Sequence, residues 1–262
     1  MPEHFFIVGA QRCGTTYLHR VLDEHPEVEM AKPVWPEPKF FLDDDQFARG
    51  LDWYGRHYFG HEPGATVRGE KSASYLESDL AARRIAAALP GARIVAMLRD
   101  PVARAVSNYW YSVENGLETL PPGDALTQDE DERAHTDEGW YLVDGARISV
   151  SPFAYRRRGR YVDDLRRYRA LFGQDRMHVL VFEATVGSAE AVSGLFAFLG
   201  VDAGFRPPSI DRVVNPGQAE TEPVPADVLE FLRDYFVEPN AELTAEFGLD
   251  LSLWTPRPAP RP

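Results

Sequence analysis

The sequence has too few cysteines for a disulfide framework or a cysteine-based metal site. Cys13 is the single cysteine among 262 residues, so no internal disulfide can form. No run of about 18 apolar residues is present either, which argues against a membrane span. The first residues also lack the basic start and long apolar stretch of a secretory signal. We therefore expect a cytoplasmic protein without a membrane partner.

Basic residues are scarce relative to acidic ones. The 28 lysines and arginines stand against 41 aspartates and glutamates, a net charge of −13. Such a balance argues against nucleic-acid binding, which relies on basic surfaces. The charge is unevenly distributed, because residues 114–138 hold nine acids and one base, whereas residues 147–169 hold eight arginines and two acids. The simplest interpretation is a solvated acidic loop beside an arginine-lined helix face.

Metal-binding patterns are missing as well. The sequence has no HExxH motif and no cluster of acidic residues and histidines at ligand spacing, so we expect no metal. His19 and His25 are expected to face solvent or to pack at a helix end.

The remaining composition is that of a folded globular protein, with 44% hydrophobic residues and 12% aromatic residues. Continuous apolar runs predict strands, and apolar residues at helical spacing predict helices between them. The expected strands are 5–8, 67–71, 93–98 and 177–182. The expected helices begin at 15 and 101 and cover 47–58, 81–89, 161–172, 195–199 and 228–236. This alternation predicts a single α/β domain over residues 1–254, with a parallel sheet covered by helices on both faces.

Two segments fall outside this pattern. Residues 116–139 combine Pro121-Pro122-Gly123 with the acidic run, so they predict a long loop, and residues 116–158 are the candidate for a lid over a substrate. The proline-rich tail, residues 255–262, is expected to be disordered.

The most informative segment is GAQRCGTT, residues 9–16, which lies between the first expected strand and the first expected helix. Glycines allow a tight turn, and the amides at a helix start face a bound anion. Thr15 and Thr16 can cap this helix. An ATP-binding loop reads GxxxxGK[ST], but here Thr15 occupies the lysine position and Arg12 is the only cation inside the loop. We interpret the segment as a site for a nucleotide phosphate.

Arg99 and Ser107 form a second candidate anion site. Arg99 follows the strand 93–98, and ligands of parallel sheets bind outside the carboxyl ends of the strands. Ser107 lies about two turns into the next helix, whose start is predicted by Asp100 and Pro101. A guanidinium and a hydroxyl suit a second phosphate. From spacing alone, a salt bridge between Arg99 and a neighbouring acid is an equal alternative.

Five motifs stand in a fixed order between residues 4 and 115. They are GAQRCGTT, EPKFF, GLDWY, GEKSASYLES and MLRDPVARAVSNYW. Together they resemble sulfotransferases that use 3′-phosphoadenosine 5′-phosphosulfate (PAPS), particularly the branch of heparan sulfate sulfotransferases and bacterial homologues, and a weaker similarity continues through residues 176–201. The resemblance implies a P-loop-like fold, PAPS as sulfuryl donor, 3′-phosphoadenosine 5′-phosphate (PAP) as product, and no metal.

The resemblance also assigns the two anion sites. Arg12 stands where the family has a catalytic lysine, and there it would stabilise charge on the leaving phosphate. The resemblance implies that the 5′-phosphate is bound by residues of the same loop and helix start (Cys13, Gly14, Thr15, Thr16). It implies that the 3′-phosphate is bound by Arg99 and Ser107. A donor with two separated phosphates explains why two anion sites are present.

Glu37 in EPKFF falls on the family's catalytic glutamate. By this resemblance it would take the proton of the acceptor hydroxyl or amine as sulfur is attacked. Lys39 would neutralise the sulfonate oxygens or orient the glutamate. Lys71 lies at another polar position near the family's active site, and Glu70 could be its salt-bridge partner.

For the acceptor, the acidic run fits poorly with an acidic polysaccharide. We expect a small neutral or cationic acceptor such as a sugar, a nucleoside or another secondary metabolite. The basic run at residues 156–158 leaves an acidic acceptor open. The alternative functions are an ATP-dependent phosphotransferase or NTPase of the P-loop class, and a nucleotide-binding module without chemistry.

Overall fold

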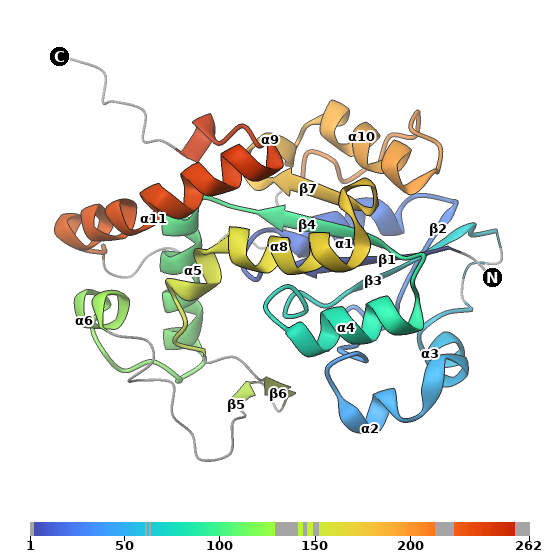
Figure 1. Cartoon of the computed structure of the whole chain (residues 1–262), viewed down its shortest axis with the longest axis horizontal. Coiled ribbons are helices and arrows are strands. Elements are labelled where there is room, and N and C mark those ends of the chain that lie inside the picture. Colours follow the sequence, from blue (N-terminus) through green and yellow to red (C-terminus); the bar gives the residue numbers. More distant parts are fainter. Residues whose placement is uncertain are drawn as a thin grey trace. The chain divides into compact units, whose positions relative to one another are not determined.

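A computed structural model describes residues 3–60, 62, 64–128, 141–143, 146–148, 152–212 and 223–254 (Figure 1). The chain divides into two compact units. The first comprises Met1–Leu98 and Asp163–Pro216, and the second comprises Arg99–Val162 and Gly217–Pro262. The first unit contains a five-stranded sheet, and the described part of the second unit is mostly helical.

The sheet of the first unit has the strand order β2-β3-β1-β4-β7, and every neighbouring pair is parallel. The strands are β1 (Glu3–Gly9), β2 (Val28–Met30), β3 (Val67–Lys71), β4 (Arg93–Leu98) and β7 (Met177–Val181). The four strands expected from the sequence are confirmed. β2 was not predicted, because three residues are too short to give a periodic signal.

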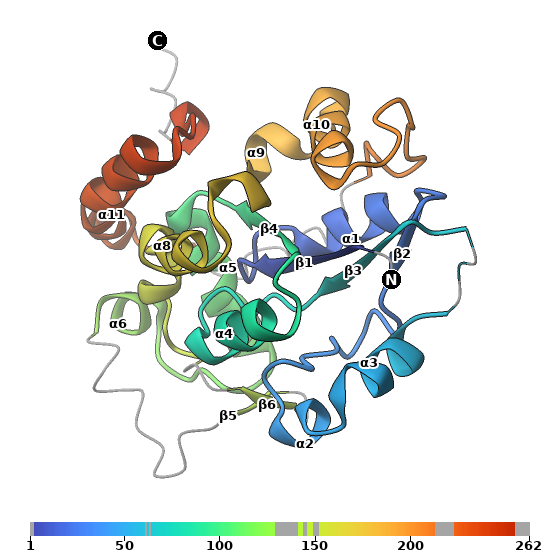
Figure 2. The ribbon, with the colours of Figure 1, turned by 45° about the vertical axis from the view of Figure 1, so that its right-hand side comes forward.

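Helices cover both faces of this sheet, which confirms the α/β class. On one face, α1 (Thr15–Asp23) and α10 (Ala189–Leu199) pack with Phe5, Ile7, Val95 and Met97. Figure 2 shows these two helices on one side of the sheet and α4 (Asp79–Ala88) on the other. Figure 1 shows α8 (Tyr161–Phe172), which belongs to this unit from Asp163 onward, on the same side of the sheet as α4.

The first unit also holds shorter elements. They are α2 (Asp44–Phe47), α3 (Gly50–Tyr58), α9 (Phe182–Thr185) and the 3₁₀ turn Gln174–Arg176. A single helix over residues 47–58 was expected, but the chain forms two. The side chain of Asp43 accepts from the Gln46 amide at 2.9 Å and caps α2, and Gly50, with φ of +80°, begins α3.

The second unit is built around α5 (Pro101–Glu114), whose start is capped by Asp100 as predicted. The other elements are α6 (Pro122–Thr127), α11 (Ala226–Phe247), two 3₁₀ turns (Arg157–Gly159, Ser252–Trp254) and the antiparallel pair β5 (Tyr141–Val143) and β6 (Ala146–Ile148). The expected long loop over 116–139 is therefore wrong at α6. Residues 129–140, with most of the acidic run, and the tail 255–262 lie outside the described residues.

Every helix in the described ranges falls short of the length and apolarity that a bilayer crossing needs.

Candidate active site

The glycine loop, residues 10–14, connects β1 with α1. The Ala10 amide donates to the Met97 carbonyl at 2.8 Å, which ties the loop to β4. Gly14 is the N-cap of α1, and no side chain caps this helix. The expectation that Thr15 or Thr16 caps it is therefore wrong. A helix start whose first-turn amides take no side-chain cap is suited to an anion.

Gly14 can be replaced by no other residue without a rearrangement. Its φ of +81° lies in the left-handed region, and a Cβ at this position would lie 2.5 Å from the Phe182 ring. The start of α1 is therefore fixed by close packing against α9.

Arg12 and Cys13 lie differently within the glycine loop. Arg12 has φ of +65°, an uncommon conformation that costs a non-glycine residue on the order of 1 kcal/mol and that is enriched at functional sites. Cys13 is buried. Its amide donates to the Ala10 carbonyl at 3.2 Å, and its thiol lies 3.5 Å from the Gln11 carbonyl. Both hydrogen-bond donors of Cys13, the amide and the thiol, thus have acceptors inside the loop, which argues against Cys13 as an anion ligand.

Glu37 is held at the carboxyl end of β3. Its Oε1 lies 2.8 Å from Lys71 Nζ, and its Oε2 accepts from the Ala73 amide at 3.0 Å. The two side chains of the ion pair are 12% and 6% exposed. The strand register pairs Lys71 with Ile7, two residues before the end of β1. Glu37 therefore lies at the sheet edge from which the glycine loop departs.

The partner of Lys71 is therefore Glu37, which corrects the suggestion that it is Glu70. Glu70 is itself buried, and accepts hydrogen bonds from Tyr54 Oη and Ser72 Oγ, each at 2.7 Å. Burial raises the pKa of Glu70 to about 7, against hydrogen bonds from Tyr75, Ser72 and Tyr54 that lower it. The sequence pointed to Lys71 and Glu70 as a neighbouring pair, but neighbours on a strand face opposite sides of the sheet.

Lys39 has φ of +50°, and its amide donates to Ser72 Oγ at 3.0 Å. Its carbonyl accepts from the Leu42 and Asp43 amides at 2.9 and 3.1 Å. Ser72 was not singled out from the sequence. Its adjacency to Lys71 in the GEKS motif was the one available signal.

The two histidines occupy different surroundings. His25 packs between Phe196 and Phe205 beyond the end of α1, as expected. His19, on α1, is 4% exposed, so it does not face solvent. Burial lowers the pKa of His19 to about 4, and the charges of Lys32 and Lys71 act in the same direction.

Arg99 and Ser107 belong to the second unit. Arg99 directly follows β4, and its carbonyl accepts from Tyr161 Oη at 2.9 Å. Ser107 lies in the second turn of α5, as predicted, and both residues are partly exposed. Arg158, one of the arginines considered for an acidic acceptor, is instead 6% exposed and donates to Asn108 Oδ1 at 3.2 Å.

No group of three or more His, Cys, Asp or Glu side chains arranged to hold a metal ion occurs within the described ranges.

A family model described as the sulfotransferase family matches residues 2–149, more than half of the chain. Among curated proteins, the chain is 38% identical over 117 residues to the human bifunctional heparan sulfate N-deacetylase/N-sulfotransferase 2 and 29% identical over 115 residues to the membrane-associated sulfotransferase kil1 of Dictyostelium discoideum. These matches cover 43% and 42% of this chain, but 13% and 23% of the two relatives. The chain thus corresponds to less than a quarter of either protein.

Solved structures are similar over nearly the whole chain. A sulfotransferase from Alicyclobacillus acidocaldarius is 31% identical, with a TM-score of 0.75, over 97% of this chain and 99% of that one. The mouse sulfotransferase SULT7A1 complexed with PAP is 14% identical, with a TM-score of 0.53, over 93% of this chain and 85% of that one. The second likeness concerns the fold alone.

Proposed function

Because the chain belongs to the sulfotransferase family and is therefore an enzyme of sulfuryl transfer, we propose that its donor is PAPS and its acceptor a small hydroxyl- or amine-bearing molecule. The observation that carries this proposal is the largely buried ion pair of Glu37 and Lys71 at the sheet edge where the glycine loop begins. It supplies a candidate base beside a candidate anion site.

The residues proposed for the donor fall into two groups, one for each phosphate. The uncapped start of α1, with Gly14, Thr15 and Thr16, suits the 5′-phosphate, and Arg12 adds a positive charge. Cys13 is left out because its amide and thiol bond within the loop. Arg99 and Ser107 are proposed for the 3′-phosphate. PAPS supplies the activated sulfuryl group, and the proposed reaction needs no metal.

Glu37 is proposed as the general base. Each of its carboxylate oxygens accepts one hydrogen bond or ion pair in the structure and retains capacity for a second. The acceptor proton passes to Glu37 as the acceptor atom bonds to sulfur and the bond from sulfur to the 5′-phosphate oxygen breaks. Lys71 holds the carboxylate in place, and Arg12 and Lys39 are proposed to stabilise the negative charge of the transferring group.

The proposed acceptor is a neutral or cationic sugar, nucleoside or other secondary metabolite. Trp35, two residues before Glu37, is 64% exposed. An exposed indole suits the flat apolar face of a sugar ring or a base. The net charge of −13 disfavours an acidic polysaccharide.

Calorimetric titration tests the donor. We expect the protein to bind PAP without Mg²⁺, and to bind ADP and ATP more weakly with or without Mg²⁺. Tighter binding of ATP than of PAP would refute the proposal and favour a P-loop phosphotransferase.

A screen with ³⁵S-labelled PAPS tests the acceptor. Uncharged glycosides and nucleosides should accept label faster than heparan sulfate fragments at equal concentration. A strong preference for the heparan sulfate fragments would show that the acceptor is acidic, against the inference from the net charge.

A further inference from the structure

The segment that carries the candidate base is fixed by the end of β3. We name residues 37–39 the base loop and residues 70–73 the β3 end segment. Three contacts join them: Lys71 Nζ to Glu37 Oε1 at 2.8 Å, the Ala73 amide to Glu37 Oε2 at 3.0 Å, and the Lys39 amide to Ser72 Oγ at 3.0 Å. The first two hold the Glu37 side chain, and the third holds the backbone of the base loop.

The third contact holds the backbone at Lys39, which has an unfavourable conformation. Lys39 has φ of +50°, which is unfavourable for a side chain with a Cβ. Such a conformation persists where surrounding contacts hold it. Ser72 Oγ, the acceptor of the Lys39 amide, is one of those contacts and is fully buried.

The direction of the hydrogen bonds through Ser72 is determined. A backbone amide can only donate, so Ser72 Oγ accepts from Lys39 and its own proton is available to Glu70 Oε1 at 2.7 Å. The other oxygen of Glu70 accepts from Tyr54 Oη at 2.7 Å. Glu70 is 1% exposed, so no competing bulk water replaces these donors.

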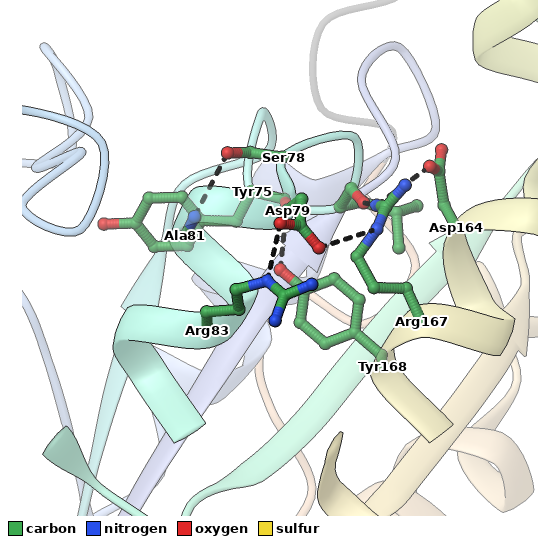
Figure 3. A network of polar contacts seen from close by, with 9 residues as sticks. Tyr75, Ser78, Asp79, Ala81, Arg83, Asp164, Arg167 and Tyr168 are labelled. Carbon is green, nitrogen blue, oxygen red and sulfur yellow. Dashed lines mark hydrogen bonds and ion pairs between the residues drawn. The ribbon is translucent and has the colours of Figure 1, made fainter. Parts of the chain in front are cut away.

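The chain beyond the β3 end segment is anchored as well. Tyr75 Oη accepts from the Phe41 amide at 3.0 Å, which ties it to the residues after the base loop. Tyr168 of α8 donates to the Tyr75 carbonyl at 2.8 Å. Figure 3 shows this contact together with those of Arg167 to Asp79 and Asp164. Glu70 and Ser72 therefore act from a fixed support.

We propose that Ser72 and Glu70 are positioning residues that hold the base loop so that the Glu37 carboxylate faces the acceptor. Ser72 acts through the Lys39 amide, and Glu70 acts by orienting the Ser72 hydroxyl. This inference rests on the proposed function of Glu37 as the base.

Ser72→Ala and Glu70→Gln test the inference. Alanine removes the acceptor of the Lys39 amide. Glutamine keeps the shape of Glu70 but places an NH₂ group where a hydroxyl donor now points, so at least one contact is lost. Ser78→Ala is the matched control, because Ser78 is a buried serine whose Oγ also accepts a backbone amide, that of Ala81 at 3.1 Å (Figure 3), and this contact involves no residue of the base loop.

Two readouts separate positioning from general destabilisation. Hydrogen exchange followed by mass spectrometry should show the Lys39 amide exchanging roughly tenfold faster or more in Ser72→Ala, and unchanged in Ser78→Ala. Turnover of ³⁵S-labelled PAPS, with the best acceptor of the screen or with water where none accepts, should fall roughly tenfold to a hundredfold in kcat. The KM for PAPS should stay within about twofold of the wild-type value, because a misplaced Glu37 impairs the chemical step and not the binding of the donor.

The outcomes distinguish failure of the proposed role of Ser72 and Glu70 from failure of the proposed function. Unchanged exchange at Lys39 and unchanged kcat in both variants overturn this inference, while the proposed function stands if the wild-type protein binds PAP. Failure of the wild-type protein to bind PAP overturns the proposed function itself. If Ser72→Ala does not fold, Glu70→Gln and Tyr54→Phe, which removes one donor to Glu70, carry the same test.

Discussion

At the scale of the residue, Glu37 is the group whose removal should have the largest effect on rate. Glu37→Gln keeps the shape of the side chain but cannot take a proton, so we expect kcat to fall roughly 10²- to 10⁴-fold. PAP should bind the variant about as well as the wild type, because Glu37 is not among the residues proposed for either phosphate. Glu190→Gln, an exposed substitution at the start of α10, is the control and should leave both quantities unchanged. Full activity of Glu37→Gln in the ³⁵S assay would contradict the proposed base.

Individual contacts were the least predictable level. Motif order placed Glu37 and Lys71 near one site, but which carboxylate pairs with Lys71 depends on side-chain direction in the folded strand. Glu70, which is next to Lys71 in the chain, accepts hydrogen bonds from the hydroxyls of Tyr54 and Ser72. Glu37, which is far away in the sequence, pairs with the ammonium of Lys71. Ser72 carries no chemical signature in the sequence, since its importance comes from accepting one amide of a distant loop.

At the scale of the element, the junction of β1, the glycine loop and α1 depends on Gly14. Gly14→Ala strains a φ of +81° and also brings a Cβ to 2.5 Å from Phe182, so the loop must shift. We expect PAP affinity to fall at least tenfold and the unfolding free energy to fall by about 1–3 kcal/mol. Gly50→Ala is a close control, because φ is +80° there but nothing lies within 4 Å of the added Cβ. It should cost stability by strain alone and leave PAP affinity unchanged. Equal PAP affinity in both variants would show that the loop is not the phosphate site.

Elements with strong periodic signals were predicted well. The buried strands β1, β4 and β7 read as continuous apolar runs, and α1, α4, α5 and α8 begin within two residues of their expected starts. β2 and α6 were missed for a common reason, since both are short and gain their stability from tertiary packing. α6 buries Ala125 and Leu126 in a cluster with α5 and α11, a contact that no local pattern reveals.

At the scale of the whole molecule, the division into two units was not visible in the sequence. The chain crosses between the units three times, and the first crossing falls between Leu98 and Arg99, where β4 is followed directly by Asp100 and α5. No glycine-rich, proline-rich or charged linker marks this first crossing, because the division is set by which residues pack together after folding. The residues proposed for the 5′-phosphate belong to the first unit and those proposed for the 3′-phosphate to the second.

The stability of the protein should respond to pH through two buried groups with opposite effects. The pKa of Glu70 is raised by burial to about 7 in the folded state, so the folded state binds more protons than the unfolded state above about pH 4.5, and stability falls as pH rises toward 7. The pKa of His19 is lowered by burial to about 4, so the unfolded state binds more protons below about pH 6.5, and stability falls as pH drops toward 4.

Each effect amounts to roughly 3 kcal/mol, and the two cancel in part between pH 4.5 and 6.5. Urea unfolding at several pH values checks this. Glu70→Gln should leave the His19 effect alone, so the unfolding free energy should rise from pH 4.5 to 6.5 more steeply than in the wild type. His19→Gln should leave the Glu70 effect, so the unfolding free energy should fall from pH 5 to 7. The test is the slope of the unfolding free energy against pH, because either substitution can also lower stability uniformly at every pH. Curves parallel to the wild type in both variants would show that neither group changes its protonation on unfolding in this range.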